Sequence, residues 1–208
     1  MSRARVRVLA EGNVGSTQVA ELRALRRLAR LACAWALLYA AYRGYYALGG
    51  TFGIFGTPVS DAAWRRINGL ASVLLVLAAV LGALAPRLHA HLRAWGGLVS
   101  AGWLITVGCV MHALVNGATR ILSLAGVLRI DYPFFTTIDR RAADLQDLLL
   151  NEPWFLVEGL LWGALCLRGM RSGTSRRRFV VSAVAAIAVL TIVGMLSATG
   201  VIGRVVVG

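Results

Sequence analysis

Five apolar runs divide this chain, and arginines accumulate in every second connection between them. The runs cover residues 31–48, 69–86, 98–117, 153–167 and 179–200. Each one approaches the length of about 20 apolar residues that a helix needs to cross a bilayer. Because unpaired backbone groups are costly in lipid, runs of this kind fold as helices. The pattern predicts an all-α integral membrane bundle of five transmembrane helices.

The arginines also predict the orientation of this bundle. They crowd the basic tail and amphipathic lead-in at 1–30 and the second and fourth connections, whereas the third connection mixes arginine with five acidic residues. Because basic residues stay on the cytoplasmic side, the N-terminus is expected in the cytoplasm and the C-terminus outside, in the plasma membrane. The membrane domain is then 31–208, and its outer loop is 118–152.

Composition supports lipid as the solvent and limits the chemistry. The chain is 58% hydrophobic with a mean hydropathy of +0.71. Its net charge of +13 comes from arginines whose placement follows the membrane, so membrane lipids and not nucleic acid are the expected partners. Lysine is absent, which excludes a lysine Schiff base. His89 and His91 lack an acidic or cysteine companion nearby, so neither a metal nor a cofactor is predicted.

The outer loop at 118–152 is long for a helical bundle, and long loops often carry function. Thr136 followed by Asp139 fits a capping box that starts a short helix reaching about Leu150. We expect this segment to form an interfacial hairpin over the outer end of the bundle.

Three ionisable residues lie within the apolar runs, and such residues are functional candidates because they are costly in lipid. They are Arg43, His112 and Glu158. With a rise of about 1.5 Å per residue, all three fall at a similar depth in the outer half of the membrane. Three separate helices therefore bring a cation, an imidazole and a carboxylate to one layer.

Polar and aromatic residues share helix faces with these three. Helical spacing places Tyr39, Tyr42 and Tyr46 beside Arg43, Asn116 beside His112, and Trp154 and Trp162 beside Glu158, while Asn68 enters the second run. The faces together predict an aromatic-walled pocket that opens outward and binds an amphiphilic ligand or a partner helix.

An intramembrane enzyme is the alternative function. Glu158 would be the catalytic acid, His112 the base, and Arg43 would hold an anionic group on a lipid or isoprenoid-like substrate. A purely structural role for these residues is a further alternative. In that case Arg43 and Glu158 would form an ion pair, and His112 would be a hydrogen-bonded helix contact. Whether the chain is an enzyme therefore stays open at this point.

Gly159 and Gly163 form a G-x-x-x-G motif in the fourth run. Such a motif allows two helices to approach closely, either inside one chain or between copies. It makes a homo-oligomer one expectation.

Residues 45–53 read Tyr-Tyr-Ala-Leu-Gly-Gly-Thr-Phe-Gly at the end of the first run. This stretch resembles a family of small bacterial multi-span membrane proteins of unknown function, whose first span ends in a similar aromatic-Ala-Leu-Gly-Gly sequence. The resemblance covers about 34–167 and departs from the family in the fifth run and the basic tail. Tyr46 stands where that family often has tryptophan. The resemblance implies a fold and a membrane class but no site residue.

Overall fold

The computed structural model describes the backbone of residues 3–202 and the side chains of residues 19–202. Its long helices are α1 (Arg3–Ala47), α2 (Asp61–Leu88), α3 (Leu92–Leu124), α5 (Glu152–Gly169) and α6 (Gly173–Ala198). The remaining elements are β1 (Gly56–Pro58), β2 (Phe135–Ile138), the short helix α4 (Arg140–Gln146) and a π-helical turn at Asp147–Asn151. The prediction of an all-α fold is confirmed, with one two-stranded ribbon added to it.

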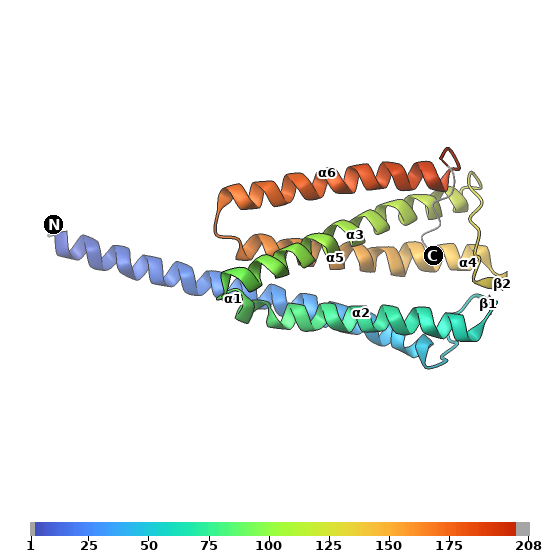
Figure 1. The fold of residues 1–208 in the computed structure, drawn as a ribbon, viewed down its shortest axis with the longest axis horizontal. Coiled ribbons are helices and arrows are strands. Elements are labelled where there is room, and N and C mark those ends of the chain that lie inside the picture. The colour runs from blue at the N-terminus through green and yellow to red at the C-terminus, as the bar shows by residue number, and fades with distance from the viewer. Residues whose placement is uncertain (1–2, 203–208) are drawn as a thin grey trace.

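The long helices run alternately in opposite directions and lie side by side (Figure 1). Helix α1 packs on α2 and α5, and α3 packs on α5 and α6. We call the end that carries β1, β2 and α4 the strand end, and the end with the α2–α3 and α5–α6 connections the arginine end. Helix α1 has 45 residues and is therefore about 68 Å long, and its first part extends beyond the bundle (Figure 1).

Among the described residues, three helices are long and apolar enough to cross a membrane: α2, α3 and α6. Helices α1 and α5 run parallel or antiparallel to them but contain more polar residues, including Arg43 in α1 and Glu152 and Glu158 in α5. Three such helices are compatible with a membrane protein. The count of five spans stays a prediction.

Every long helix also exposes large apolar side chains. Helix α6 buries only Phe179 and Ala183 and leaves most of its valines, leucines and isoleucines exposed. Exposed faces of this kind include Leu70, Leu74 and Leu77 on α2, Leu37 and Leu38 on α1, and Leu160 on α5. A water-soluble monomer rarely exposes so much contiguous apolar surface, whereas lipid solvates it at no cost.

The segment expected as an outer loop at 118–152 is mostly helical. Helix α3 continues to Leu124, and α4, the π-helical turn and α5 follow one another from Arg140 to Gly169. The prediction that Thr136 caps this helix is wrong, because Thr136 lies in β2. The N-cap of α4 is Asp139, whose carboxylate accepts a hydrogen bond from Ala142 N at 3.1 Å. Strand β2 pairs antiparallel with β1 from the first connection and ties two loops together.

The glycines of α5 serve packing within the chain. A Cβ atom on Gly159 would lie 2.8 Å from Val110 Cγ2, and one on Gly163 would lie 3.3 Å from Thr106 Cγ2. Both glycines are buried against α3. The G-x-x-x-G motif of Gly159 and Gly163 therefore serves a helix contact within the chain, and a homo-oligomer stays a prediction.

Gly102 on α3 also packs tightly on α5, and it supplies a test of the packing. A Cβ atom there would lie 2.3 Å from Cys166 Sγ and 3.2 Å from Trp162 Cε3. We expect Gly102→Ala to destabilise the protein by about 1–3 kcal/mol through overpacking. Thermal unfolding in detergent measures this loss. Gly108→Ala is the matched control, because Gly108 lies on the same helix with nothing within 4 Å of its Cβ position. Equal melting temperatures for the two variants would contradict the packing.

Candidate functional site

Arg43 joins α1 to α2 at the strand end. Its Nη1 donates to Asn68 Oδ1 at 3.1 Å and its Nη2 donates to Tyr39 Oη at 3.0 Å. Asn68 is fully buried, and its Nδ2 donates to Trp64 O at 2.9 Å, which fixes the orientation of the amide. The guanidinium also lies 5.1 Å from the centre of the Tyr39 ring. Among the described residues no carboxylate lies within 4.0 Å of Arg43, and its Nε is buried without a partner.

A second guanidinium, that of Arg120 on α3, is fully neutralised. Its Nη2 lies 2.7 Å from Asp147 Oδ2 and its Nη1 lies 3.3 Å from Asp144 Oδ1. Asp144 is almost fully buried and accepts hydrogen bonds from Tyr132 Oη at 2.5 Å and from Ser123 Oγ at 2.6 Å. Burial, reinforced by the hydrogen bond to Asp144, raises the pKa of the Tyr132 hydroxyl, so this group stays protonated and donates.

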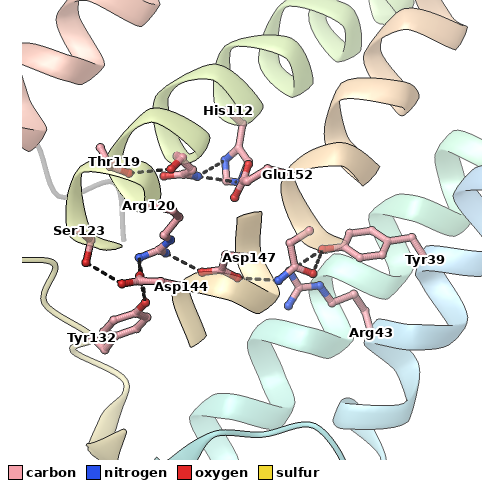
Figure 2. A network of polar contacts seen from close by, with 12 residues as sticks. Tyr39, Arg43, His112, Thr119, Arg120, Ser123, Tyr132, Asp144, Asp147 and Glu152 are labelled. Atoms are coloured by element: carbon pink, nitrogen blue, oxygen red, sulfur yellow. Dashed lines mark hydrogen bonds and ion pairs between the residues drawn. The ribbon is translucent and has the colours of Figure 1, made fainter. Parts of the chain in front are cut away.

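The two arginines belong to one continuous chain of polar contacts (Figure 2). Asn151 Nδ2 donates to Asp147 Oδ1 at 2.6 Å, and Asn151 Oδ1 accepts from Tyr39 Oη at 3.2 Å. Asp147 and Asn151 are the first and last residues of the π-helical turn, a conformation that occurs frequently at functional sites. The chain of contacts runs from Ser123 on α3, through this turn, to Arg43 on α1 and Asn68 on α2.

His112 and Glu158 each contact a residue that helical spacing placed beside them on the same helix, Asn116 for His112 and Trp162 for Glu158. His112 Nε2 lies 3.8 Å from Glu152 Oε2 and 2.9 Å from Asn116 Nδ2. Glu158 accepts a hydrogen bond from Trp162 Nε1 at 2.9 Å on its own helix, and its Oε2 is buried without a partner. In the described part of the chain, Glu158 forms no ion pair with Arg43 and no hydrogen bond with His112. The predicted Arg43–Glu158 ion pair is therefore wrong.

The reason for this difference is rotation about the helix axes. The rise per residue gives the depth of a side chain but not the direction in which it points. Arg43 faces α2, where it donates to Asn68, whereas Glu158 accepts its hydrogen bond from Trp162 within α5. A common depth therefore did not place the three ionisable groups in contact.

The aromatic residues divide between the site and the core. The Trp154 ring stacks on Trp35 at 4.2 Å and on Tyr39 at 5.3 Å between ring centres, so it packs behind Arg43. Trp162 is fully buried in the apolar core with Leu25 and Trp95. The prediction that Trp162 lines the pocket is wrong, because its ring packs between α1, α3 and α5 nearer the arginine end.

A cavity of about 200 Å³ lies at the strand end, and we call it the strand-end cavity. Residues 53–55 of the first connection and Phe135 and Ile138 of the third line it. Of the predicted pocket residues, Tyr42, Arg43 and Tyr46 line it. Tyr39 and Asn68 contact Arg43 from outside it, while His112, Asn116, Trp154 and Glu158 are not part of its wall. The wall also contains residues the sequence did not single out: Trp64, Arg120, Tyr132, Gln146, Asp147 and Asn151.

Several hydrogen bonds hold this wall in place. Gln146 Nε2 donates to Gly53 O at 3.1 Å and to Tyr42 Oη at 3.2 Å, and Tyr46 Oη donates to Phe52 O at 3.0 Å. These bonds attach the first connection to α1 and α4. The cavity is thus a pre-formed space and not a gap between separate loops.

One signal in the sequence points to the missed residues. The third connection alone mixes arginines with several carboxylates, and Arg120, Asp144 and Asp147 belong to it. Such a mixture is expected where charges neutralise one another inside a protein. The prediction of an outer loop at 118–152 did not use this signal. In the described residues no group of three His, Cys, Asp or Glu side chains is arranged to hold a metal ion.

Comparison with protein-family models, with curated proteins and with solved structures finds no match to this chain. The resemblance of residues 45–53 to the aromatic-Ala-Leu-Gly-Gly family stays a prediction.

The neutralisation of Arg120 supplies a test. Arg120→Leu leaves Asp144 and Asp147 without their cation, and breaking a buried pair in this way costs about 3–5 kcal/mol. Unfolding by sodium dodecyl sulfate in mixed micelles measures the loss. Arg141→Leu is the control, since Arg141 is exposed on the neighbouring helix α4. A triple variant that also carries Asp144→Leu and Asp147→Leu should recover part of the stability. No recovery would contradict the assignment of the cost to unpaired charge.

Proposed function

We propose that the chain is an integral plasma-membrane protein in which all five long helices cross the bilayer, with the N-terminus in the cytoplasm and the C-terminus outside. Three observations support the proposal: the alternating direction of the helices, their exposed apolar faces, and the arginines at one end of the bundle. Helices α1 and α5 lie alongside α2, α3 and α6, so a membrane that contains these three surrounds the other two as well. The strand end then faces outward.

Cysteine labelling tests this topology at one exposed residue in each connection. Thr51→Cys and Arg129→Cys lie at the strand end, and His91→Cys and Arg171→Cys lie at the arginine end. In intact cells, a membrane-impermeant maleimide should label positions 51 and 129 and spare positions 91 and 171 until the cells are opened. The unsubstituted chain, with its native cysteines within helices, is the control. Labelling of 129 and 171 from the same side would mean that α5 does not cross.

We further propose that the protein is a non-catalytic binding module whose strand-end cavity holds the headgroup of an amphiphile. The observation that carries this proposal is Arg43: a half-buried guanidinium that lines the cavity, with only neutral hydrogen-bond partners among the described residues. An uncompensated charge in a low-dielectric site is costly. An anionic group on a ligand would offset that cost.

Arg43 and not Arg120 is the expected anion-binding residue. The charge of Arg120 is already balanced by Asp144 and Asp147, so an incoming anion would meet two carboxylates there. The Arg43 side of the cavity contains Tyr42, Tyr46 and Trp64, whose rings and hydroxyl groups suit a polar headgroup.

The size of the cavity limits what it can hold. At about 30 Å³ per water molecule, 200 Å³ corresponds to roughly seven waters, which is enough for a headgroup and not for a whole lipid or a partner helix. Leu48 and Phe52 lie in the first connection, and both side chains are more than 85% exposed. The tail of an amphiphile would lie against such residues in the surrounding membrane.

A set of detergents with one dodecyl tail and three different headgroups tests the proposal. Dodecyl phosphate should bind with at least about tenfold higher affinity than dodecyl maltoside or dodecyltrimethylammonium, because a hydrogen bond to a charged group contributes about 1.5–3 kcal/mol. Arg43→Gln should remove this preference. Binding is measured by native mass spectrometry, supported by thermal shift.

Arg66→Gln is the matched control, because Arg66 is exposed on α2 at the same end but does not line the cavity. A preference for phosphate that survives in Arg43→Gln, or is lost equally in Arg66→Gln, would contradict the proposal. The alternative of an intramembrane enzyme has less support, since its acid Glu158 and its base His112 have separate partners. Glu158→Gln should therefore bind dodecyl phosphate as the wild type does.

A further inference from the structure

A groove of about 1060 Å³ lies between α3 and α6 at the arginine end, far from the strand-end cavity. The two helices contact each other, and they lie close together at the strand end and further apart toward the arginine end (Figure 1). Its apolar walls come from Leu104 of α3 and from Val181 and Ala185 of α6, and Trp103 spans it by donating from Nε1 to Ser182 Oγ at 3.0 Å. Because α6 is exposed along most of its length, the groove opens toward lipid.

One end of the groove is cationic. Arg177 and Arg178 line it together with the hydroxyl-bearing residues Thr174 and Ser175. Both arginines are exposed, and within residues 19–202 neither lies within 4.0 Å of a carboxylate. Only Glu11 and Glu21 precede α2 in the sequence, and the other acidic residues lie at the start of α2, in the third connection or in α5. The positive charge at this end is thus largely unbalanced by the protein itself.

The groove therefore has a cationic head and an apolar body. Arg177 and Ala185 are eight residues apart on α6, which corresponds to about 12 Å along the helix. A phospholipid has the complementary shape, with an anionic phosphate next to an acyl chain. In a bilayer the phosphate lies at the interface and the chain runs inward along the helices, as the groove does.

We propose that this groove binds an anionic phospholipid, with Arg177 and Arg178 contacting the headgroup and one acyl chain lying between α3 and α6 against Trp103, Leu104 and Ala185. The site is independent of the strand-end cavity and of any ligand bound there. It would anchor α6, which buries few of its own side chains, to the rest of the bundle through the lipid.

A second, smaller groove of about 640 Å³ lies on the other side of α6 and shares Arg177. Its remaining arginines are Arg168 and Arg176, and Arg176 Nε already donates to Met170 O at 2.9 Å. Arg178 and Ala185 line only the larger groove of the two. These two residues therefore distinguish the proposed site.

The test is the affinity of the full chain in dodecyl maltoside for dioleoylphosphatidylglycerol, measured by native mass spectrometry against dioleoylphosphatidylcholine, which has the same acyl chains. With about 1 kcal/mol for each arginine at a membrane surface, Arg177→Gln/Arg178→Gln should weaken phosphatidylglycerol binding about thirtyfold. Arg87→Gln/Arg93→Gln removes the same charge from the same end, outside the groove, and should bind as the wild type does. Equal weakening in both double variants would overturn the proposal, because it would indicate general attraction to the charged end.

Ala185→Trp fills the apolar part of the groove while all arginines remain. It should weaken binding of the long-chain lipid at least about tenfold, which corresponds to the loss of a few buried methylene contacts. Unchanged binding by this variant would overturn the placement of the acyl chain. Inorganic phosphate and glycerol phosphate should not compete at millimolar concentration, and competition by either would overturn the lipid in favour of a free phosphate. The melting temperature of each variant in detergent shows that it is folded before its affinity is compared.

Discussion

A charge inside a membrane bundle is stable only where an opposite charge or several hydrogen bonds replace its water, and this constraint organises the strand end of the protein. Arg120 is held between Asp144 and Asp147, and these carboxylates are supported in turn by Tyr132, Ser123 and Asn151. The contacts join α3, the third connection and the start of the α4–α5 helical segment, beside the strand-end cavity that Arg120, Tyr132 and Asp147 line.

Hydrogen bonds, in place of an opposite charge, stabilise the Arg43 guanidinium. It contacts amide, phenol and ring groups, and in the described part of the chain no carboxylate lies within 4.0 Å of it. The contrast between the two arginines separates their roles. Arg120 has two carboxylate partners within the fold, whereas Arg43 is the residue that we propose binds a ligand. Polar residues buried in a membrane protein therefore need to be judged by their partners and not by burial alone.

Small residues set the helix geometry on which these contacts depend. Gly102, Gly159 and Gly163 bring α3 and α5 close together, and Gly82 lets α2 approach α1 near Ala29 and Cys33. Close approach of this kind is the usual source of helix association in lipid, where burial of apolar surface contributes little. The two ends of the bundle then differ in chemistry. At the strand end Arg120 has carboxylate partners, while Arg177 and Arg178 at the arginine end are exposed and, among the described residues, have none within 4.0 Å.

The sequence alone indicated the helices that carry the apolar runs and the connections at which the arginines collect, because these are local properties of length, periodicity and composition, but it did not indicate that the connection at 118–152 is mostly helical. It also indicated that Arg43, Tyr42 and Tyr46 lie together, since one helix carries all three. Only the tertiary structure decided which helix faces meet. The rotation of each helix about its axis paired His112 on α3 with Glu152 on α5, and packing of α3 against α4 and the π-helical turn placed Arg120 between two carboxylates. Those outcomes depend on packing between segments distant in the chain, which no local pattern encodes.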